Sequence, residues 1–320
     1  MREKFIGETI RQKRVERGLT QEELCAGLCD PSTLSRIETG KQSPSRNRSN
    51  ALLQRLGQPH DRYYTFLTAH EAEADALRTN IDNYFTRFRQ SLGAEKHQAR
   101  LDALEQLDRL EAITEVNDKI GRQYILAARA ALGEENGPYS FEVRLDMLLK
   151  AIRLTVPRFD IDALGGHLYS LDESGIISQI AETYSKAGDH KKAASIFSQL
   201  LTYMQEHYQD VTQPSQHLPP ATLNYARELC LMGCYEKALE TAELGQKTCL
   251  EYGYCQSLPG LLAVMAECQC AKEETELGRE LYCQAYYLYK ETGNASGLAS
   301  VEDSAKKWLG PGFPLQGGLL

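Results

Sequence analysis

The chain has 320 residues, 36 Lys and Arg against 44 Asp and Glu and a formal net charge of −8, a length sufficient for two or three domains. No stretch is apolar for long enough to cross a bilayer, and the first residues lack the apolar segment of a secretory signal, so we expect no membrane partner. The nine cysteines show no metal-ligand spacing, and we interpret them as reduced, space-filling residues of a cytoplasmic protein without metal or cofactor.

Four short helices around one small core are predicted for residues 1–57. The residues that mark the boundaries of the second and third helices are Thr20, Glu23, Asp30, Pro31 and Gly40. The threonine and glutamate form the pattern of a capping box, the aspartate is predicted to cap the third helix, and the glycine ends that helix in the left-handed conformation. Two short helices joined by a tight turn are typical of a helix-turn-helix that binds duplex DNA.

Several residues of this stretch also match a known family motif. They are Arg14, Gly18, Leu19, Thr20, Gln21, Leu24, Leu28, Ser35, Arg36, Ile37, Glu38 and Gly40. Together they resemble the phage-repressor helix-turn-helix of the Cro/C1 or XRE type. The resemblance implies an internal ion pair between Arg14 and Glu38, and a contact from Gln21 to the DNA backbone.

In this family the exposed start of the third helix reads base edges. The matching positions are Ser32, Thr33, Ser35 and Arg36. Only Cys29 separates Leu28 from Asp30, a turn one residue shorter than in the commonest members. The shorter turn resembles that of the PlcR and Rgg regulators, which are bacterial peptide-pheromone receptors.

The charge distribution is compatible with a DNA partner at one end of the molecule. Residues 1–56 hold eleven Lys and Arg and seven Asp and Glu, which gives +4 and leaves −12 on the rest of the chain. Lys41, Arg46 and Arg48 follow the recognition helix and are candidate phosphate contacts. Each of them could equally be an ordinary solvated charge, because charged residues cover most protein surfaces.

After Gly57 and Pro59, residues 60–92 show apolar residues at intervals of three and four, which predicts one long helix. It could connect the head to the body or contribute to a dimer interface. The later chain contains helical hairpins that resemble 34-residue tetratricopeptide (TPR) repeats, at 174–207, at 219–252 and, less regularly, at 259–293. Residues 101–132 and 141–156 are interpreted as a further hairpin.

Stacked hairpins of this kind form a solenoid with a concave inner face, which commonly binds an extended peptide or a partner helix. The first helices of the hairpins offer Gln179, Glu182, Lys186, Asn224, Arg227, Glu228 and Glu267 as candidate peptide-binding residues. Asn224 and Arg227 are the strongest candidates, because an amide can pair with a peptide backbone and a guanidinium can bind a carboxylate. The alternative is that these are solvated groups on amphipathic helices.

Two segments are predicted to be irregular. Residues 209–220 contain three prolines and read as a loop between hairpins, and residues 310–320 read as a loose tail. No Gly-rich phosphate loop, HExxH or GxSxG motif occurs, so we interpret the chain as a non-enzyme.

The sequence therefore predicts an all-α protein with a helix-turn-helix domain at 1–58, a connecting helix at 59–95, a TPR-like solenoid at 96–309 and a tail at 310–320. The hypothesis is a homodimeric bacterial transcription regulator. Its head binds operator DNA, and its body senses a ligand, which the resemblance implies is a short quorum-sensing peptide. The alternatives are a TPR interaction scaffold and a repressor whose repeats serve only dimerisation.

Overall fold

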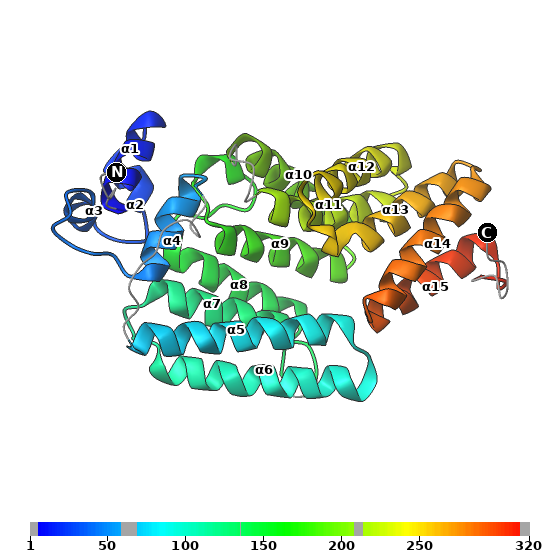
Figure 1. The fold of residues 1–320 in the computed structure, drawn as a ribbon, viewed down its shortest axis with the longest axis horizontal. Coiled ribbons are helices and arrows are strands. Elements are labelled where there is room, and N and C mark those ends of the chain that lie inside the picture. The colour runs from blue at the N-terminus through cyan, green and yellow to red at the C-terminus, as the bar shows by residue number, and fades with distance from the viewer. Residues whose placement is uncertain (1–5, 59–68, 135, 208–213, 314–320) are drawn as a thin grey trace.

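A computed structural model describes residues 6–58, 69–134, 136–207 and 214–313, and every regular element within them is helical (Figure 1). The α-helices are α1 (Ile6–Glu16), α2 (Gln21–Cys25), α3 (Pro31–Glu38), α4 (Arg46–Arg55), α5 (Ala69–Gln90), α6 (Gly93–Ile113), α7 (Lys119–Leu132), α8 (Phe141–Thr155), α9 (Leu171–Lys186), α10 (His190–His207), α11 (Pro214–Leu231), α12 (Tyr235–Tyr252), α13 (Leu258–Ala271), α14 (Thr275–Glu291) and α15 (Ala295–Leu309), with short 3-10 turns η1 (Leu164–Gly166) and η2 (Cys255–Ser257). The predicted all-α class is confirmed. None of the helices in these ranges is both long and apolar enough to span a membrane.

The first four helices form a head with its own apolar core. Its fully buried side chains come from all four helices: Ile10, Leu24, Leu34, Ile37, Leu52, Leu53 and Leu56. The predicted capping box is present, since Thr20 Oγ1 accepts a hydrogen bond from Glu23 N and the Glu23 carboxylate accepts one from Thr20 N. The fourth helix, expected from the leucines at 52, 53 and 56 to span 50–56, begins four residues earlier at Arg46, because the Ser45 side chain caps it.

The other helices, α5 to α15, form one curved array in which each helix packs against the next. The first helices of successive hairpins, α7, α9, α11, α13 and α15, also contact one another and form the inner side of the array. The last helix, α15, additionally contacts α5. The inner side is therefore bounded by α5 at one end of the array and by α15 at the other.

Helix α5 lies in the range expected to connect the head to the body, and it packs along α6 as the first member of the array. Their shared core contains Leu77 and Ile81 of α5 and Leu107 of α6. Residues 59–68 of the expected helix lie outside the described residues. The expected helix at 101–132 is divided by a turn into α6 and α7. At this turn Asp118 caps the N-terminus of α7, because its carboxylate accepts a hydrogen bond from Gly121 N.

The expectation of a loop at 209–220 was wrong in its second half. Helix α11 begins at Pro214 and includes Pro219 and Pro220, while residues 208–213 lie outside the described residues. Leu218 and Ala221 of this segment are buried in the core of the array. The apolar contacts of this segment outweigh the local tendency of proline to break helices, which is why the composition misled.

The start of the tail is also packed, contrary to the expectation of a loose end. Phe313 is buried, and its ring makes edge contacts with Tyr282 at 6.1 Å and Tyr286 at 5.9 Å between centroids. The aromatic ring removes apolar surface from water and so holds residues 310–313 on α14. Residues 314–320 lie outside the described residues.

Candidate DNA-recognition surface and ligand groove

The recognition helix α3 is held on the head by Leu34 and Ile37, which are fully buried. Pro31 occupies its first turn, and Gly40 follows it with a φ of 72°, as predicted. Asp30 stands at the N-cap position with an extended backbone, but its carboxylate makes no capping hydrogen bond, so that part of the prediction was wrong. The helix start is fixed by the proline and by the core leucine instead.

Arg14 and Glu38 form a two-pronged ion pair within the head. Arg14 Nε donates to Glu38 Oε1 at 2.6 Å and Nη2 donates to Oε2 at 2.9 Å, while Nη1 donates to the carbonyl of Leu19. The hydrogen bonds that Arg14 donates to Glu38 raise the pKa of its guanidinium above the ordinary value, against the opposing effect of burial. Gln21 Nε2 donates to Glu38 Oε2 at 2.7 Å, so the same carboxylate orients the amide expected to touch the DNA backbone.

The four predicted base-facing residues lie on the outer side of α3. Ser32 and Arg36 are exposed, and Thr33 and Ser35 are half-buried. Figure 1 places α3 at the outer end of the head, away from the helical array. The array therefore leaves this surface open to a nucleic acid.

The three cations beyond α3 differ in their surroundings. Lys41 is exposed. Arg46 Nη1 is 3.0 Å from the Asp75 carboxylate of α5, and Arg48 is half-buried. Lys41 is thus the most accessible candidate phosphate contact, whereas Arg46 is already paired with the body.

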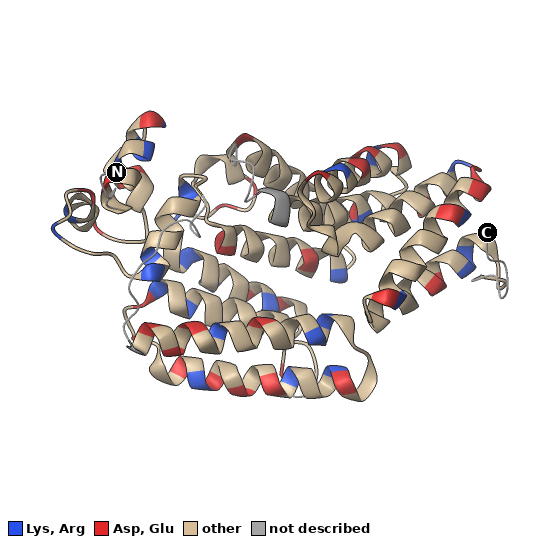
Figure 2. Cartoon of the chain, viewed as in Figure 1, with Lys and Arg blue, Asp and Glu red and all other residues tan. Residues whose placement is uncertain are grey.

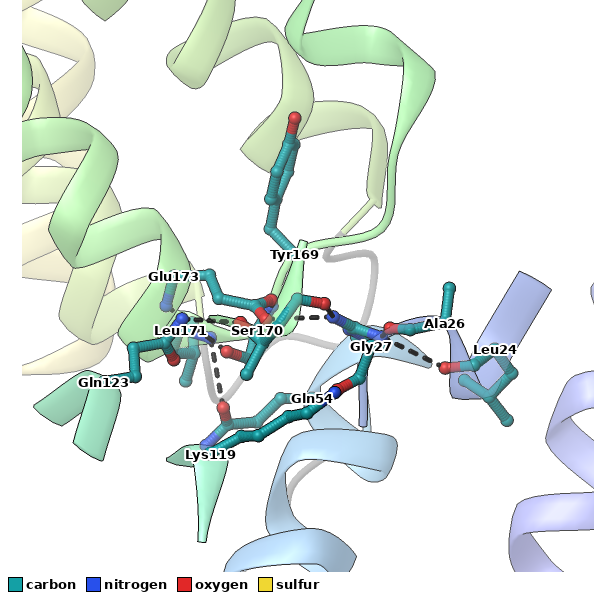
Figure 3. Close-up of polar contacts among 12 residues, drawn as sticks. Leu24, Ala26, Gly27, Gln54, Lys119, Gln123, Tyr169, Ser170, Leu171 and Glu173 are labelled. Carbon is teal, nitrogen blue, oxygen red and sulfur yellow. Dashed lines mark hydrogen bonds and ion pairs between the residues drawn. The ribbon is translucent and has the colours of Figure 1, made fainter. Parts of the chain in front are cut away.

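A buried arginine joins the head to the body, and Figure 3 labels three of its partners, Leu24, Ala26 and Glu173. Arg55 of α4 is 1% exposed, and its Nη1 donates to the carbonyls of Leu24 and Ala26 in the head. Its Nη2 donates to the carbonyl of Thr155 at 3.1 Å and to Glu173 Oε1 at 2.9 Å in the body. One guanidinium therefore connects the turn of the helix-turn-helix to α8 and α9.

Neighbouring residues extend this junction. Gln54 Oε1 accepts a hydrogen bond from Leu171 N at 3.0 Å, beside the capping box that starts α9. Gly27 lies so close to α8 that a Cβ on it would be 1.8 Å from the Thr155 carbonyl oxygen. Sequence reasoning missed the junction, because Arg55 and Glu173 are 118 positions apart and Arg55 sits in a leucine-rich helix.

The inner side of the array contains two adjoining hollows of about 630 and 570 Å³, which share Thr86, Arg89 and Gln256 in their walls. We call the two together the groove. Of the predicted peptide-binding residues, Glu182, Lys186, Asn224, Arg227 and Glu228 line the first hollow and Gln179 lines the second. Glu267 lines neither of them; its negative charge adds to the effect of burial in raising the pKa of Tyr235 and of Tyr282.

Two of the groove carboxylates already have protein partners. Glu228 is 5% exposed. One of its carboxylate oxygens accepts a hydrogen bond from Ser185 Oγ at 2.5 Å, and the other lies 2.9 Å from His190 Nδ1. Glu182 accepts from Asn224 Nδ2 at 3.3 Å and lies 3.7 Å from Arg144 Nη2. Glu228 thus contributes to packing between α9, α10 and α11, and Asn224 is oriented by Glu182.

The cysteines are separate thiols in the described residues, and no group of His, Cys, Asp and Glu there could hold a metal ion. Cys230 and Cys268 are buried with their sulfurs 3.4 Å apart, and their contact together with burial raises the pKa of Cys230 well above its ordinary value. Cys234, which lies between α11 and α12, is exposed. The raised pKa disfavours the thiolate, the reactive form of cysteine.

The head matches a known family model and the whole chain matches known structures. Residues 10–62 match the helix-turn-helix family model HTH_3. The fold is similar to that of Bacillus thuringiensis PlcR in complex with the peptide PapR7 and DNA, with 19% identity, coverage of 93% of this chain and 99% of that chain, and a TM-score of 0.59. It is also similar to PlcR in its apo form, with 17% identity, coverage of 93% and 98%, and a TM-score of 0.55.

A third structure, the SHP pheromone receptor Rgg2 of Streptococcus dysgalactiae, has 14% identity, coverage of 95% and 99%, and a TM-score of 0.45. A search of curated proteins gave no match. At identities of 17% and 19%, the likeness to the two PlcR structures shows the fold alone.

Proposed function

We propose that this protein is a transcription regulator that binds duplex DNA through α3 and binds a short peptide in the groove. The observation that carries the first part is the polar surface of α3, with Ser32 and Arg36 exposed and Thr33 and Ser35 half-buried, on a head that matches a helix-turn-helix family model. A helix with exposed polar residues near its start can enter the major groove, where side chains discriminate base pairs.

The second part rests on the groove and on the fold. The groove is lined by amide, hydroxyl and charged side chains from several first helices, which suits an extended backbone with alternating donors and acceptors. Gln179 Oε1 is a buried acceptor without a donor among the described residues. The Bacillus thuringiensis PlcR structure of similar fold is a complex with the peptide PapR7 and DNA.

The proposed assembly is a homodimer in the cytoplasm of a bacterium. A single head of this size buries too little surface for tight and specific binding, and two heads on one operator supply the rest. The peptide would act by binding one arrangement of the heads more tightly than another, since a ligand without such a preference shifts no equilibrium.

The test is selection of bound duplexes from a random DNA pool by the purified protein, followed by titration of the enriched sequence. The matched variants are Arg36→Ala on α3 and Arg109→Ala, an exposed arginine of α6. We expect Arg36→Ala to abolish the preference for the enriched sequence and Arg109→Ala to retain it. Failure to enrich any sequence would refute the regulator and favour the interaction scaffold.

A further inference from the structure

The first hollow of the groove is lined by three cations and two carboxylates, Glu182 and Glu228, and so has a local excess of positive charge in a body that is acidic overall (Figure 2 shows where the Lys, Arg, Asp and Glu residues lie). Arg89 of α5, Lys186 of α9 and Arg227 of α11 line the same hollow from three different helices. Among the described residues none of the three forms an ion pair. Residues 57–320 carry a net charge of −12, so the collection of cations here is not a reflection of composition.

A fourth cation lies beneath these three. The Arg144 side chain is 8% exposed, its nearest carboxylate is Glu182 at 3.7 Å, and its Nε has no partner among the described residues. Glu182 is thus the carboxylate that faces both Arg144 and Lys186. A buried charge is costly unless it is well compensated, and one carboxylate shared between two cations leaves a deficit of negative charge.

The protonation equilibria of these groups show the same imbalance. Desolvation of its ammonium lowers the pKa of Lys186 although the residue as a whole is exposed, and the cations Arg144, Lys96 and Arg89 lower it further. Burial likewise lowers the pKa of Arg144. Burial is the largest cause of the lowered pKa in both groups; neighbouring cations add to it and Glu182 opposes it.

We propose that the cations of the groove, Arg89, Lys186 and Arg227, bind the C-terminal carboxylate of the peptide, an inference that rests on the proposed function. Cations from three helices can reach a C-terminal carboxylate together, because no further peptide residue follows it and blocks their approach. Arginine and lysine form charge-assisted hydrogen bonds to a carboxylate that are about twice as strong as neutral ones. The carboxylate would also supply the negative charge that the site lacks.

The remaining groove residues would then contact the peptide upstream of its terminus. Ser296 and Gly297 in the first turn of α15 line the same hollow as Arg227, and Gln179 lines the adjoining one. The positive end of the α15 dipole adds to the field of the cations. The peptide would thereby run from the second hollow, near α7 and α9, towards the cations and α15.

The experiment uses the full-length protein and three synthetic heptapeptide libraries. One has free C-terminal carboxylates, one has C-terminal amides, and one has free carboxylates but contains no Asp or Glu. Binding peptides are recovered by affinity selection and mass spectrometry, and each is resynthesised as acid and amide for titration. The variants are Lys186→Met and Arg227→Met, with Lys191→Met and Arg153→Met as controls, since both control residues are exposed outside the groove.

We expect binders from the library without Asp and Glu, and a loss of at least ~10-fold in affinity on amidation, which corresponds to the strength of a hydrogen bond to a charged group. Lys186→Met and Arg227→Met should lose a similar factor with the acid and little with the amide, while the controls bind as the unaltered protein does. Thermal melts should be unchanged, because both replaced side chains are exposed.

Equal affinity of acid and amide would overturn the inference and leave the proposed function intact. Binders that require Asp or Glu and tolerate amidation would assign the cations to a side-chain carboxylate, which also overturns it. Absence of binders from all three libraries would refute peptide binding itself, and the inference with it.

Discussion

The guanidinium of Arg55 lies 2.9 Å from the carboxylate of Glu173, and the two side chains are 2% and 1% exposed. One belongs to the head and the other to the body, so the contact is both an ion pair and a junction between domains. Such a pair contributes little net stability by its formation, but it is costly to break, because the surviving charge stays buried.

Replacing Arg55 with methionine is therefore expected to lower the free energy of unfolding by roughly 3–5 kcal/mol. Asp146→Asn, which removes the exposed pair between Asp146 and Lys150, is the control and should cost less than about 1 kcal/mol. Denaturant titration followed by circular dichroism and by a probe on the head measures both. A loss for Arg55→Met as small as that of the control would show that the pair is dispensable.

Gly27→Ala should disrupt the junction without touching any charge. Gly27 and Gly18 both have positive φ, 75° and 68°, so alanine at either position is strained by about 1–2 kcal/mol. Only at Gly27 would the new methyl group collide with the Thr155 carbonyl, since nothing lies within 4 Å of a Cβ at Gly18. Hydrogen exchange of peptides spanning 153–175 should accelerate in Gly27→Ala and stay normal in Gly18→Ala.

Lys41→Ala should weaken binding to all DNA sequences by a similar factor. A lysine that neutralises one phosphate releases about one counterion, so the slope of log K against log salt should become shallower by about 0.9. The preference for the enriched operator over unrelated duplex should not change, in contrast to Arg36→Ala. Titrations at several salt concentrations decide this, and an unchanged slope would mean that Lys41 lies off the DNA.

The stability of the protein should depend on pH through His207. Burial and the nearby Arg17 lower the pKa of His207 below its ordinary value of 6.5, and its ring stacks on Tyr203. Between that lowered pKa and 6.5 the unfolded chain binds more protons than the folded one. The contribution of neutral His207 to the free energy of unfolding is therefore fully present above pH 6.5 and is lost as the pH falls towards the lowered pKa.

Between pH 7.5 and 5 the melting temperature should therefore fall less steeply for His207→Gln than for the unaltered protein. His97→Gln, on an exposed position of α6, is the control and should follow the unaltered protein. Parallel curves for all three proteins would contradict the assignment.

Local patterns in the sequence were sufficient for the head and for most of the hairpins. The capping box at Thr20, the stop at Gly40 and the pairing of α9 with α10 each depend on residues close in sequence, where spacing is informative. The two wrong segments depend on distant contacts. The helix around Pro219 is held by Leu218 and Ala221, which are buried in the core of the array, and Phe313 is held by the tyrosines of α14.

The same distinction applies to the candidate sites. The spacing on α9 and α11 brought Glu182, Asn224 and Arg227 to one hollow, as first helices of a solenoid should. The spacing could not show that the Glu228 carboxylate is paired with His190, or that Arg89 of α5 lies beside the other cations of the first hollow. Those facts depend on how the array curves, which repeat periodicity does not encode.

The head is attached through Gln54 and Arg55 at the C-terminal end of α4, whereas α3, the proposed DNA-binding helix, lies at the outer end of the head (Figure 1). Operator contact therefore requires no release of the head from the body. Because the head is fixed to α8 and α9, a change in the curvature of the array would move the head as a rigid body. In a pair of such chains on one operator, the number of base pairs between the two half-sites would then depend on that curvature.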